Sequence, residues 1–136
     1  MKHAINILLA EDNPADVYLV RRAFKELDGF ERIHVARDGE EALEMLRLGK
    51  LRPSLVIVDL NVPKLGGLEV IQAMKSDPAL RAIPVVVLTG SDAPGDVVRA
   101  YELGCAGYLK KPPTRVEYEG VAEALQSYWF RACLTP

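Results

Sequence analysis

The stretch that most constrains the fold is an apolar run from Leu55 to Val58 that ends on the carboxylate of Asp59. A continuous apolar run of this length, rich in β-branched residues, is typical of a strand buried on both faces of a parallel sheet. Pro63 and the glycine pair after it predict a loop before the next helix. Asp59 should therefore lie at the carboxyl end of a central strand, where open α/β sheets bind their ligands.

The rest of the chain alternates predicted strands with amphipathic helices. Further strands are expected over residues 5–10, 33–36, 85–88 and 107–110, and helices over residues 14–28, 39–48, 68–76, 95–103 and 115–129. Asp38 and Thr114 are expected N-caps, and Gly104 is an expected C-cap. Five strand–helix units with right-handed crossovers predict an α/β fold, a doubly wound five-stranded parallel sheet with helices on both faces. The flavodoxin-like strand order 2-1-3-4-5 is the one we expect.

Composition narrows the class of protein. The 136 residues suffice for one domain with a full hydrophobic core, and a formal net charge of -2 argues against a general nucleic-acid binder. The sequence contains no apolar run of membrane-spanning length and no signal-peptide core at its start, so we expect a cytoplasmic protein without a membrane partner. Cys105 and Cys133 form no CxxC pair, which favours free thiols.

Acidic residues also end the first predicted strand. Glu11 and Asp12 follow it, and in the flavodoxin-like order this strand lies beside the one that ends on Asp59. Three carboxylates a few ångströms apart repel and raise one another's pKa unless a cation lies between them. Mg²⁺ prefers hard oxygen ligands and accepts one or two carboxylates plus a phosphate oxygen. The sequence therefore predicts a magnesium site at this edge of the sheet.

The last two strands end on a hydroxyl and an amine. Thr89 follows the fourth strand and Lys111 the fifth, so both can reach a phosphoryl group on Asp59. A carboxylate nucleophile, a metal and a lysine are the parts that phosphoryl transfer requires. Each part is weak evidence alone, because strand-end acids often cap helices and single lysines usually lie on the surface. Their joint occurrence at four strand ends predicts phosphoryl transfer.

The chain resembles the receiver domain of two-component response regulators over nearly its whole length. The matching segments are residues 7–13, 58–63, 87–90 and 107–112. The resemblance implies that Asp59 accepts a phosphoryl group from a histidine kinase. It also implies that Asp12 and Asp59 bind Mg²⁺ together with the backbone carbonyl of Asn61, and that Glu11 acts on the metal through water.

The same resemblance assigns three further roles. Thr89 and Tyr108 resemble the family's switch pair, in which the hydroxyl moves to the phosphoryl group and the ring turns inward. Lys111 rather than Lys110 matches the family's lysine, because that lysine directly precedes a proline. The bond between Lys111 and Pro112 is cis in the family pattern, so we expect a cis-proline here.

Three positions depart from the family pattern. Glu11 stands where aspartate is more common and gives a longer reach to the metal. Gly66 replaces an aspartate, so one helix should lack its side-chain cap. Pro113 replaces an apolar or aromatic residue, which affects the expected shape of the loop but not the chemistry.

The resemblance also implies a stand-alone regulator. We expect one receiver domain over residues 1–136, with no output domain, that catalyses its own phosphorylation and slowly hydrolyses the product rather than acting as an enzyme on other substrates. Residues 13–16, 83–89, 101–103 and 128–130 look like those of small receivers that partner phytochrome-type kinases. The expected partner is therefore a phytochrome-type sensor histidine kinase.

Three consecutive aromatic residues, Tyr128, Trp129 and Phe130, point in different directions around a helix and cannot all enter one core. They either cap the end of the domain or form part of an interface, where aromatic side chains are enriched. The similar phytochrome-partner receivers form homodimers through this end of the fold. We therefore expect a homodimer through the face of the fourth and fifth helices and the C-terminal end.

Other functions fit the residues less well. A phosphatase with an aspartate nucleophile, of the haloacid dehalogenase type, needs a second acid two residues after Asp59, but position 61 is asparagine. A flavodoxin would not place Glu11 and Asp12 against a flavin phosphate. The remaining alternative is a pseudo-receiver, a binding module that is not phosphorylated.

Overall fold

The computed structural model describes residues 5–25, 31–49 and 51–128 and contains one parallel sheet of five strands in the order β2-β1-β3-β4-β5. The strands are β1 (Ile5–Ala10), β2 (Glu31–Ala36), β3 (Leu55–Val58), β4 (Val85–Thr89) and β5 (Gly107–Lys110). The helices are α1 (Pro14–Lys25), α2 (Gly39–Arg47), α3 (Gly67–Ser76), α4 (Pro94–Leu103) and α5 (Arg115–Leu125). This architecture confirms the predicted α/β fold and its strand order.

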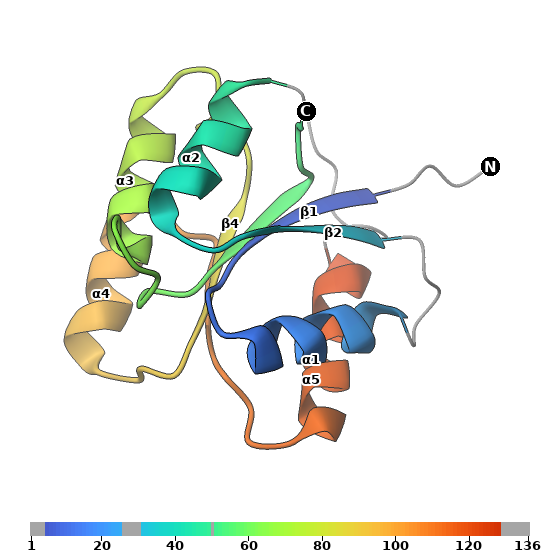
Figure 1. Cartoon of the computed structure of the whole chain (residues 1–136). Coiled ribbons are helices and arrows are strands. Elements are labelled where there is room, and N and C mark those ends of the chain that lie inside the picture. Colours follow the sequence, from blue (N-terminus) through green and yellow to red (C-terminus); the bar gives the residue numbers. More distant parts are fainter. Residues whose placement is uncertain (1–4, 26–30, 50, 129–136) are drawn as a thin grey trace.

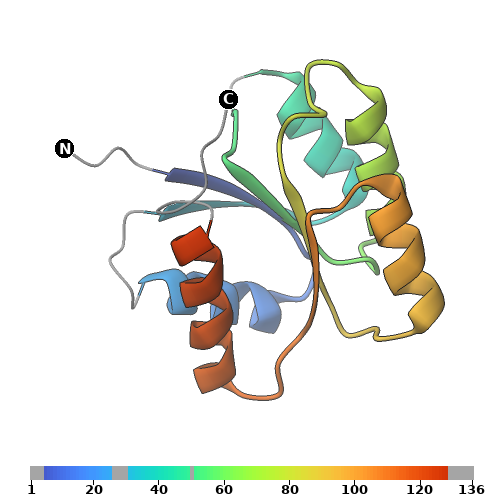
Figure 2. The same cartoon turned by 180° about the vertical axis from the view of Figure 1, so that it is seen from behind.

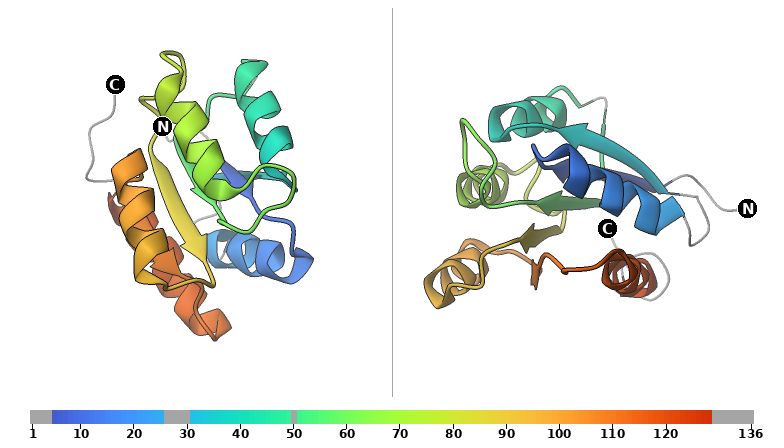
Figure 3. Two further views of the ribbon diagram at one scale, coloured as in Figure 1. Left: turned by 90° about the vertical axis from the view of Figure 1, so that its left-hand side faces the viewer. Right: turned by 60° about the horizontal axis from the view of Figure 1, so that its bottom comes forward.

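The helices form a layer on each face of the sheet. Helices α2, α3 and α4 cover one face, and α1 and α5 lie together on the other (Figure 1 and, from behind, Figure 2). The right view of Figure 3 shows the strands between the two layers. Strand β3 serves both cores, because successive side chains of a strand point to opposite faces. Val56 and Val58 pack with the first layer, and Leu55 and Ile57 pack with the second.

The strand register brings the predicted site residues to one edge of the sheet. Ala10 of β1 pairs with Val58 of β3, so the residues that follow these two strands are neighbours. The backbone N–H of Asp59 donates to the carbonyl of Ala10 at 3.0 Å. On the other side, the N–H of Lys111 donates to the carbonyl of Thr89 at 2.7 Å. Four strand ends therefore meet around Asp59.

The predicted caps are present. The side chain of Asp38 accepts a hydrogen bond from the N–H of Glu41 at 2.8 Å, and Thr114 accepts one from the N–H of Glu117 at 3.3 Å. Gly104 ends α4 with a left-handed φ of 106°, which glycine adopts without strain. Gly66 precedes α3 without a side-chain cap, as expected.

Several element boundaries differ from expectation, and one lies outside the described residues. Helices α2 and α3 and strand β4 each differ by one residue at one end, and α5 ends at Leu125, before the expected residue 129. Strand β2 begins at Glu31, two residues earlier than its apolar pattern indicated, because its pairing with β1 continues to Ile5. Helix α4 begins at Pro94, since proline suits the first helical position. The expected end of the first helix near residue 28 falls in a segment that is not described. None of the helices within the described ranges has the length and apolar character of a membrane span.

Candidate functional site

Asp59 lies at the centre of the site and is only 5% exposed. Its Oδ1 accepts hydrogen bonds from the hydroxyl of Thr89 at 2.7 Å and from the backbone N–H of Asn61 at 3.1 Å. Its Oδ2 accepts a hydrogen bond from the ammonium of Lys111 at 2.7 Å. Donors from three separate strand ends thus converge on one carboxylate.

These donors decide the ionisation state of Asp59. Burial alone would raise the pKa of its carboxyl group, because a low-dielectric environment disfavours the charged form. The hydrogen bonds from Lys111, Asn61 and Thr89 outweigh burial, and the pKa of Asp59 is lower than its ordinary value. At neutral pH, Asp59 is therefore a carboxylate anion, which is the form that acts as a nucleophile.

Lys111 contacts three carboxylates at once. Its Nζ lies 2.6 Å from Glu11 Oε1, 2.7 Å from Asp16 Oδ2 and 2.7 Å from Asp59 Oδ2. Burial would lower the pKa of this ammonium, but the three carboxylates raise it above its ordinary value. Lys110, in contrast, points to the surface and pairs with Asp92 at 2.9 Å.

Asp16 is a site residue that the sequence did not reveal. It lies in the first turn of α1, where acidic residues are common because they interact favourably with the helix dipole. Because its position in the helix already accounts for an acidic residue, the sequence gives no reason to expect its contact with Lys111, which lies 95 positions further along the chain. The useful signal is its place two residues after the helix start at Pro14, because that end of α1 borders the site.

Glu11 is buried, with 3% of its surface exposed. Burial raises the pKa of its carboxyl group, and the charge of Asp59 acts in the same direction. The bond to Lys111 and the backbone N–H of Asn13, which donates to Oε2 at 3.2 Å, offset this effect only in part. The charged form of Glu11 therefore depends on a nearby positive charge.

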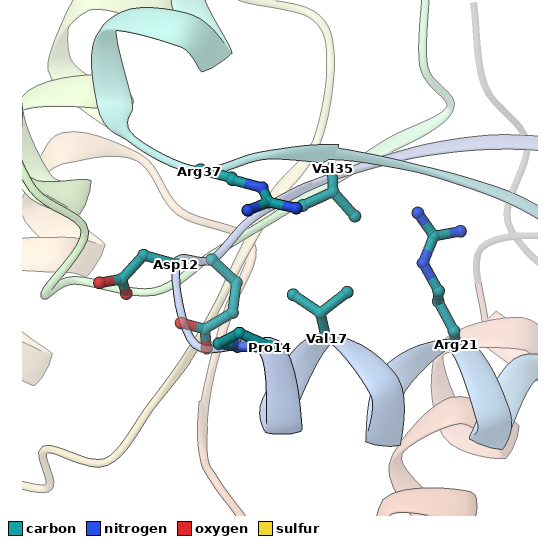
Figure 4. Close-up of a pocket in the computed structure, with 7 residues that line it drawn as sticks. Asp12, Pro14, Val17, Arg21, Val35 and Arg37 are labelled. Carbon is teal, nitrogen blue, oxygen red and sulfur yellow. The ribbon is translucent and has the colours of Figure 1, made fainter.

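Asp12 lies at the exposed rim of the site. It borders a cavity of about 200 Å³, whose lining is Glu11, Asp12, Pro14, Val17, Arg21, Val35 and Arg37. Figure 4 shows the Asp12 carboxylate directed away from Val17 and Arg21. The structure thus groups Glu11 and Asp59 around Lys111, whereas Asp12 remains open to solvent.

The donor set suits a divalent cation. Three carboxylates share the one ammonium of Lys111, which leaves an excess of negative charge, and Asp12 adds a further carboxylate at the rim. Within residues 5–25, 31–49 and 51–128, no three His, Cys, Asp or Glu side chains are arranged to hold a metal by themselves. Mg²⁺ does not require such a cage, because it keeps several waters and uses one or two carboxylates plus a phosphate oxygen.

The two expected switch residues are in different surroundings. Thr89 is fully buried against Asp59. The ring of Tyr108 is half-buried beside the core under α4, and its hydroxyl donates to the carbonyl of Ser91 at 2.8 Å. Tyr108 thus contacts the loop that begins just after Thr89.

The prediction of a cis bond before Pro112 is wrong. The bond between Lys111 and Pro112 is trans, as is every peptide bond in the described ranges. The trans form of an X–Pro bond is favoured by about 0.5–1 kcal/mol. Here the trans chain already carries Lys111 to Thr89 and Asp59, so nothing in the site requires the cis form.

The aromatic residues at the end of the chain are only partly described. Tyr128 is 57% exposed just beyond α5. Trp129 and Phe130 lie outside the described residues. The predicted contribution of these three residues to an interface therefore stays a prediction.

Comparison with known proteins identifies the family. Residues 7–121 match the model of the response regulator receiver domain. The chain belongs to this family. The probable methanogenesis regulatory protein FilR2 of Methanothrix harundinacea is 43% identical to this receiver over 127 residues, covering 90% of this chain and 82% of FilR2. The response regulator Rcp1 of Synechocystis is 36% identical over 135 residues, covering 96% and 92% of the two chains.

Solved structures share the fold of this receiver. The phosphorylated cyanobacterial phytochrome response regulator RcpA is 34% identical and superimposes with a TM-score of 0.92, over 99% of each chain. Rcp1 in its Mn²⁺-bound form is 35% identical with a TM-score of 0.88, over 97% and 99%. The receiver domain of the Pseudomonas aeruginosa kinase PA1611, 25% identical with a TM-score of 0.75 over 93% and 97%, holds a magnesium ion in its active-site cleft. Homologues of this receiver thus bind divalent metal ions.

Proposed function

We propose that this receiver accepts a phosphoryl group from a histidine kinase onto Asp59 in a Mg²⁺-dependent reaction. The observation that carries the proposal is the ionised, buried carboxylate of Asp59 with Thr89 and Lys111 bound to its two oxygens. The positive charge of Lys111 and the hydroxyl of Thr89 are therefore next to Asp59 before the phosphorylated kinase binds, which supports a role for both residues around a transferred phosphoryl group.

The chemistry follows from these contacts. A carboxylate oxygen of Asp59 attacks the phosphorus of a phosphohistidine, a P–O bond forms, and the P–N bond breaks with its electrons leaving on the imidazole. The Lys111 ammonium then neutralises negative charge on the phosphoryl oxygens, and the Thr89 hydroxyl donates a hydrogen bond to one of them. Glu11, Asp12, Asp59 and the carbonyl of Asn61 would hold Mg²⁺, which when bound neutralises further phosphoryl charge. In this proposal the receiver catalyses the transfer itself, and slow hydrolysis of the acyl phosphate returns it to the initial state.

The output of the proposed reaction is a change in protein contacts. Thr89 bonds to Asp59 and Tyr108 contacts the adjoining loop, so a phosphoryl group on Asp59 shifts the populations of conformations on the side of α4 and β5. Large apolar side chains are exposed on α4 (Val98 and Tyr101), in the first turn of α5 (Val116) and just beyond the end of α5 (Tyr128). This exposure supports a homodimer through the face of α4 and α5.

The upstream partner we propose is a phytochrome-type sensor histidine kinase. The support is the similarity over nearly the full chain to RcpA, a phytochrome response regulator, and to Rcp1. The cytoplasmic location expected from its sequence belongs to the same proposal.

A phosphotransfer assay tests this proposal. A purified phytochrome-type kinase, labelled with ³²P on its histidine, should pass the label to the wild-type receiver within minutes and leave the Asp59→Asn variant unlabelled. A labelled histidine kinase of an unrelated sensor class serves as the comparison and should transfer at least about tenfold more slowly, which corresponds to about 1.4 kcal/mol of discrimination. Equal transfer from both kinases would contradict the phytochrome assignment, and transfer from neither would contradict the receiver function.

A further inference from the structure

Asp16 links the phosphorylation site to two helices. Its Oδ2 accepts a hydrogen bond from the Lys111 ammonium at 2.7 Å. Its Oδ1 lies 3.5 Å from the hydroxyl of Tyr118, which donates to it from α5. The Asp16 side chain is 21% exposed, and Tyr118 is only 3% exposed in the core between the sheet and the layer of α1 and α5. One carboxylate thus joins α1, the end of β5 and α5.

The contacts of Lys111 define what Asp16 does. A lysine ammonium has three N–H donors, and here each has one carboxylate partner: Glu11, Asp16 and Asp59. The donor on Asp59 is the one that turns to a phosphoryl oxygen after transfer. The other two carboxylates hold the ammonium in position while that donor changes partner. Without Asp16, the ammonium is held only by Glu11 on one side.

We propose that Asp16 is a positioning residue for the phosphorylation of Asp59, acting through Lys111. The inference rests on the proposed function, since it concerns the rate of that reaction. Tyr118 orients the Asp16 carboxylate from the other side. Burial, with the charge of Asp16, raises the pKa of Tyr118 to about 12, so its hydroxyl keeps the proton that it donates.

Two other roles for Asp16 predict different behaviour. A residue that only stabilised the first turn of α1 through the helix dipole would affect stability and leave the rate unchanged. A carboxylate that mainly withdrew Lys111 from Asp59 would slow the reaction, so its removal would increase the rate. If Asp16 positions Lys111, removal of its carboxylate should instead lower the phosphorylation rate of Asp59. A side chain of the same shape should restore that rate.

The test measures the rate of adduct formation from acetyl phosphate by intact mass, at saturating Mg²⁺ and over a range of donor concentrations. Asp16→Ala should lower the maximal rate about tenfold and leave the half-saturating donor concentration unchanged, because misplaced catalytic groups slow the chemical step. Asp16→Asn should restore the rate to within about threefold of wild type, since its amide oxygen still accepts from Lys111. Tyr118→Phe should lower the rate about threefold.

The controls separate positioning from stability and from a failure of the proposed function. Glu69→Ala removes an acid from the first turn of α3 and should leave the rate unchanged. Thermal melts record folding, and Tyr118→Phe carries the test if Asp16→Ala does not fold. An Asp16→Ala rate at or above that of wild type, or no recovery with Asp16→Asn, would overturn the inference while leaving the proposed function intact. A wild type that forms an adduct with neither acetyl phosphate nor a phosphorylated histidine kinase would instead overturn the proposed function, and the inference with it.

Discussion

Replacing Lys111 by methionine should slow the phosphorylation of Asp59 by about a hundredfold or more. The ammonium of Lys111 is already 2.7 Å from Asp59 Oδ2, where charge develops during transfer. Removal of one such preorganised donor typically costs a factor of about 10²–10³ in rate. The measurement is the rate of adduct formation with acetyl phosphate at saturating Mg²⁺. A loss of less than about fivefold would contradict the role given to Lys111.

The same substitution should destabilise the fold in the absence of metal. Methionine leaves Glu11, Asp16 and Asp59 together without their cation, and an uncompensated buried charge costs about 3 kcal/mol. Urea unfolding in EDTA at pH 7 measures this difference. Lys110→Met is the matched control, because its pair with Asp92 is exposed, and exposed ion pairs contribute little to stability.

The difference in unfolding free energy between wild type and Lys111→Met should become smaller as the pH falls. Burial opposes the ionisation of Asp59, but bonds from Lys111, Asn61 and Thr89 lower its pKa. A carboxyl group with a lowered pKa stabilises the fold above its unfolded-state pKa of about 4 and loses that contribution as the pH falls. The stability difference between wild type and Lys111→Met should be full at pH 7 and should narrow below about pH 4. A constant difference from pH 7 to pH 3 would show that charge is not its cause.

Gly39→Ala should lower the free energy of unfolding by about 2 to 3 kcal/mol, at the upper end of what overpacking costs. A Cβ on Gly39 would overlap the carbonyl oxygen of Leu65, and its neighbouring atoms would also be too close. The two nearest atoms belong to the backbone of Leu65 and the third is its Cβ, so none of them can turn away as the end of a flexible side chain does. The loop that contains Leu65 also carries Asn61, whose N–H donates to Asp59, so the phosphorylation rate should fall as well.

Gly120→Ala is the matched control for this change. Gly120 is exposed in α5, and a Cβ there would meet no atom within 4 Å. The same chemical change should therefore stabilise the fold by up to about 1 kcal/mol, because alanine favours helix over glycine. Urea unfolding of both variants gives the comparison. Equal effects at the two positions would contradict the close packing of α2 against the loop after β3.

The sheet, and the site residues that end its strands, could be predicted from the sequence. The apolar runs of β1, β3 and β4 indicated buried parallel strands, because only a sheet covered on both faces tolerates such continuous apolar sequence. The strand order then placed Glu11, Thr89 and Lys111 near Asp59, since the ends of parallel strands meet at one edge. These predictions depend on local pattern and topology, which the sequence expresses directly.

Long-range side-chain contacts were harder to predict. Asp16 reaches Lys111 only because the β5–α5 connection passes the start of α1, and no local pattern records that approach. The exposure of Asp12 and the trans bond before Pro112 likewise depend on the exact course of two loops. In these places packing and loop geometry decide the outcome, and neither has a periodic signature in the sequence.

The most direct test of the receiver function is the intact mass of the protein after incubation with acetyl phosphate, with and without Mg²⁺, for wild type and Asp59→Asn. The buried, ionised Asp59 predicts one phosphoryl adduct on wild type with Mg²⁺, and none without Mg²⁺ or on Asp59→Asn. An adduct that persists in Asp59→Asn would contradict Asp59 as the phosphoryl acceptor. A folded wild-type protein that forms no adduct here, and accepts no phosphoryl group from a phosphorylated histidine kinase, would contradict the receiver function.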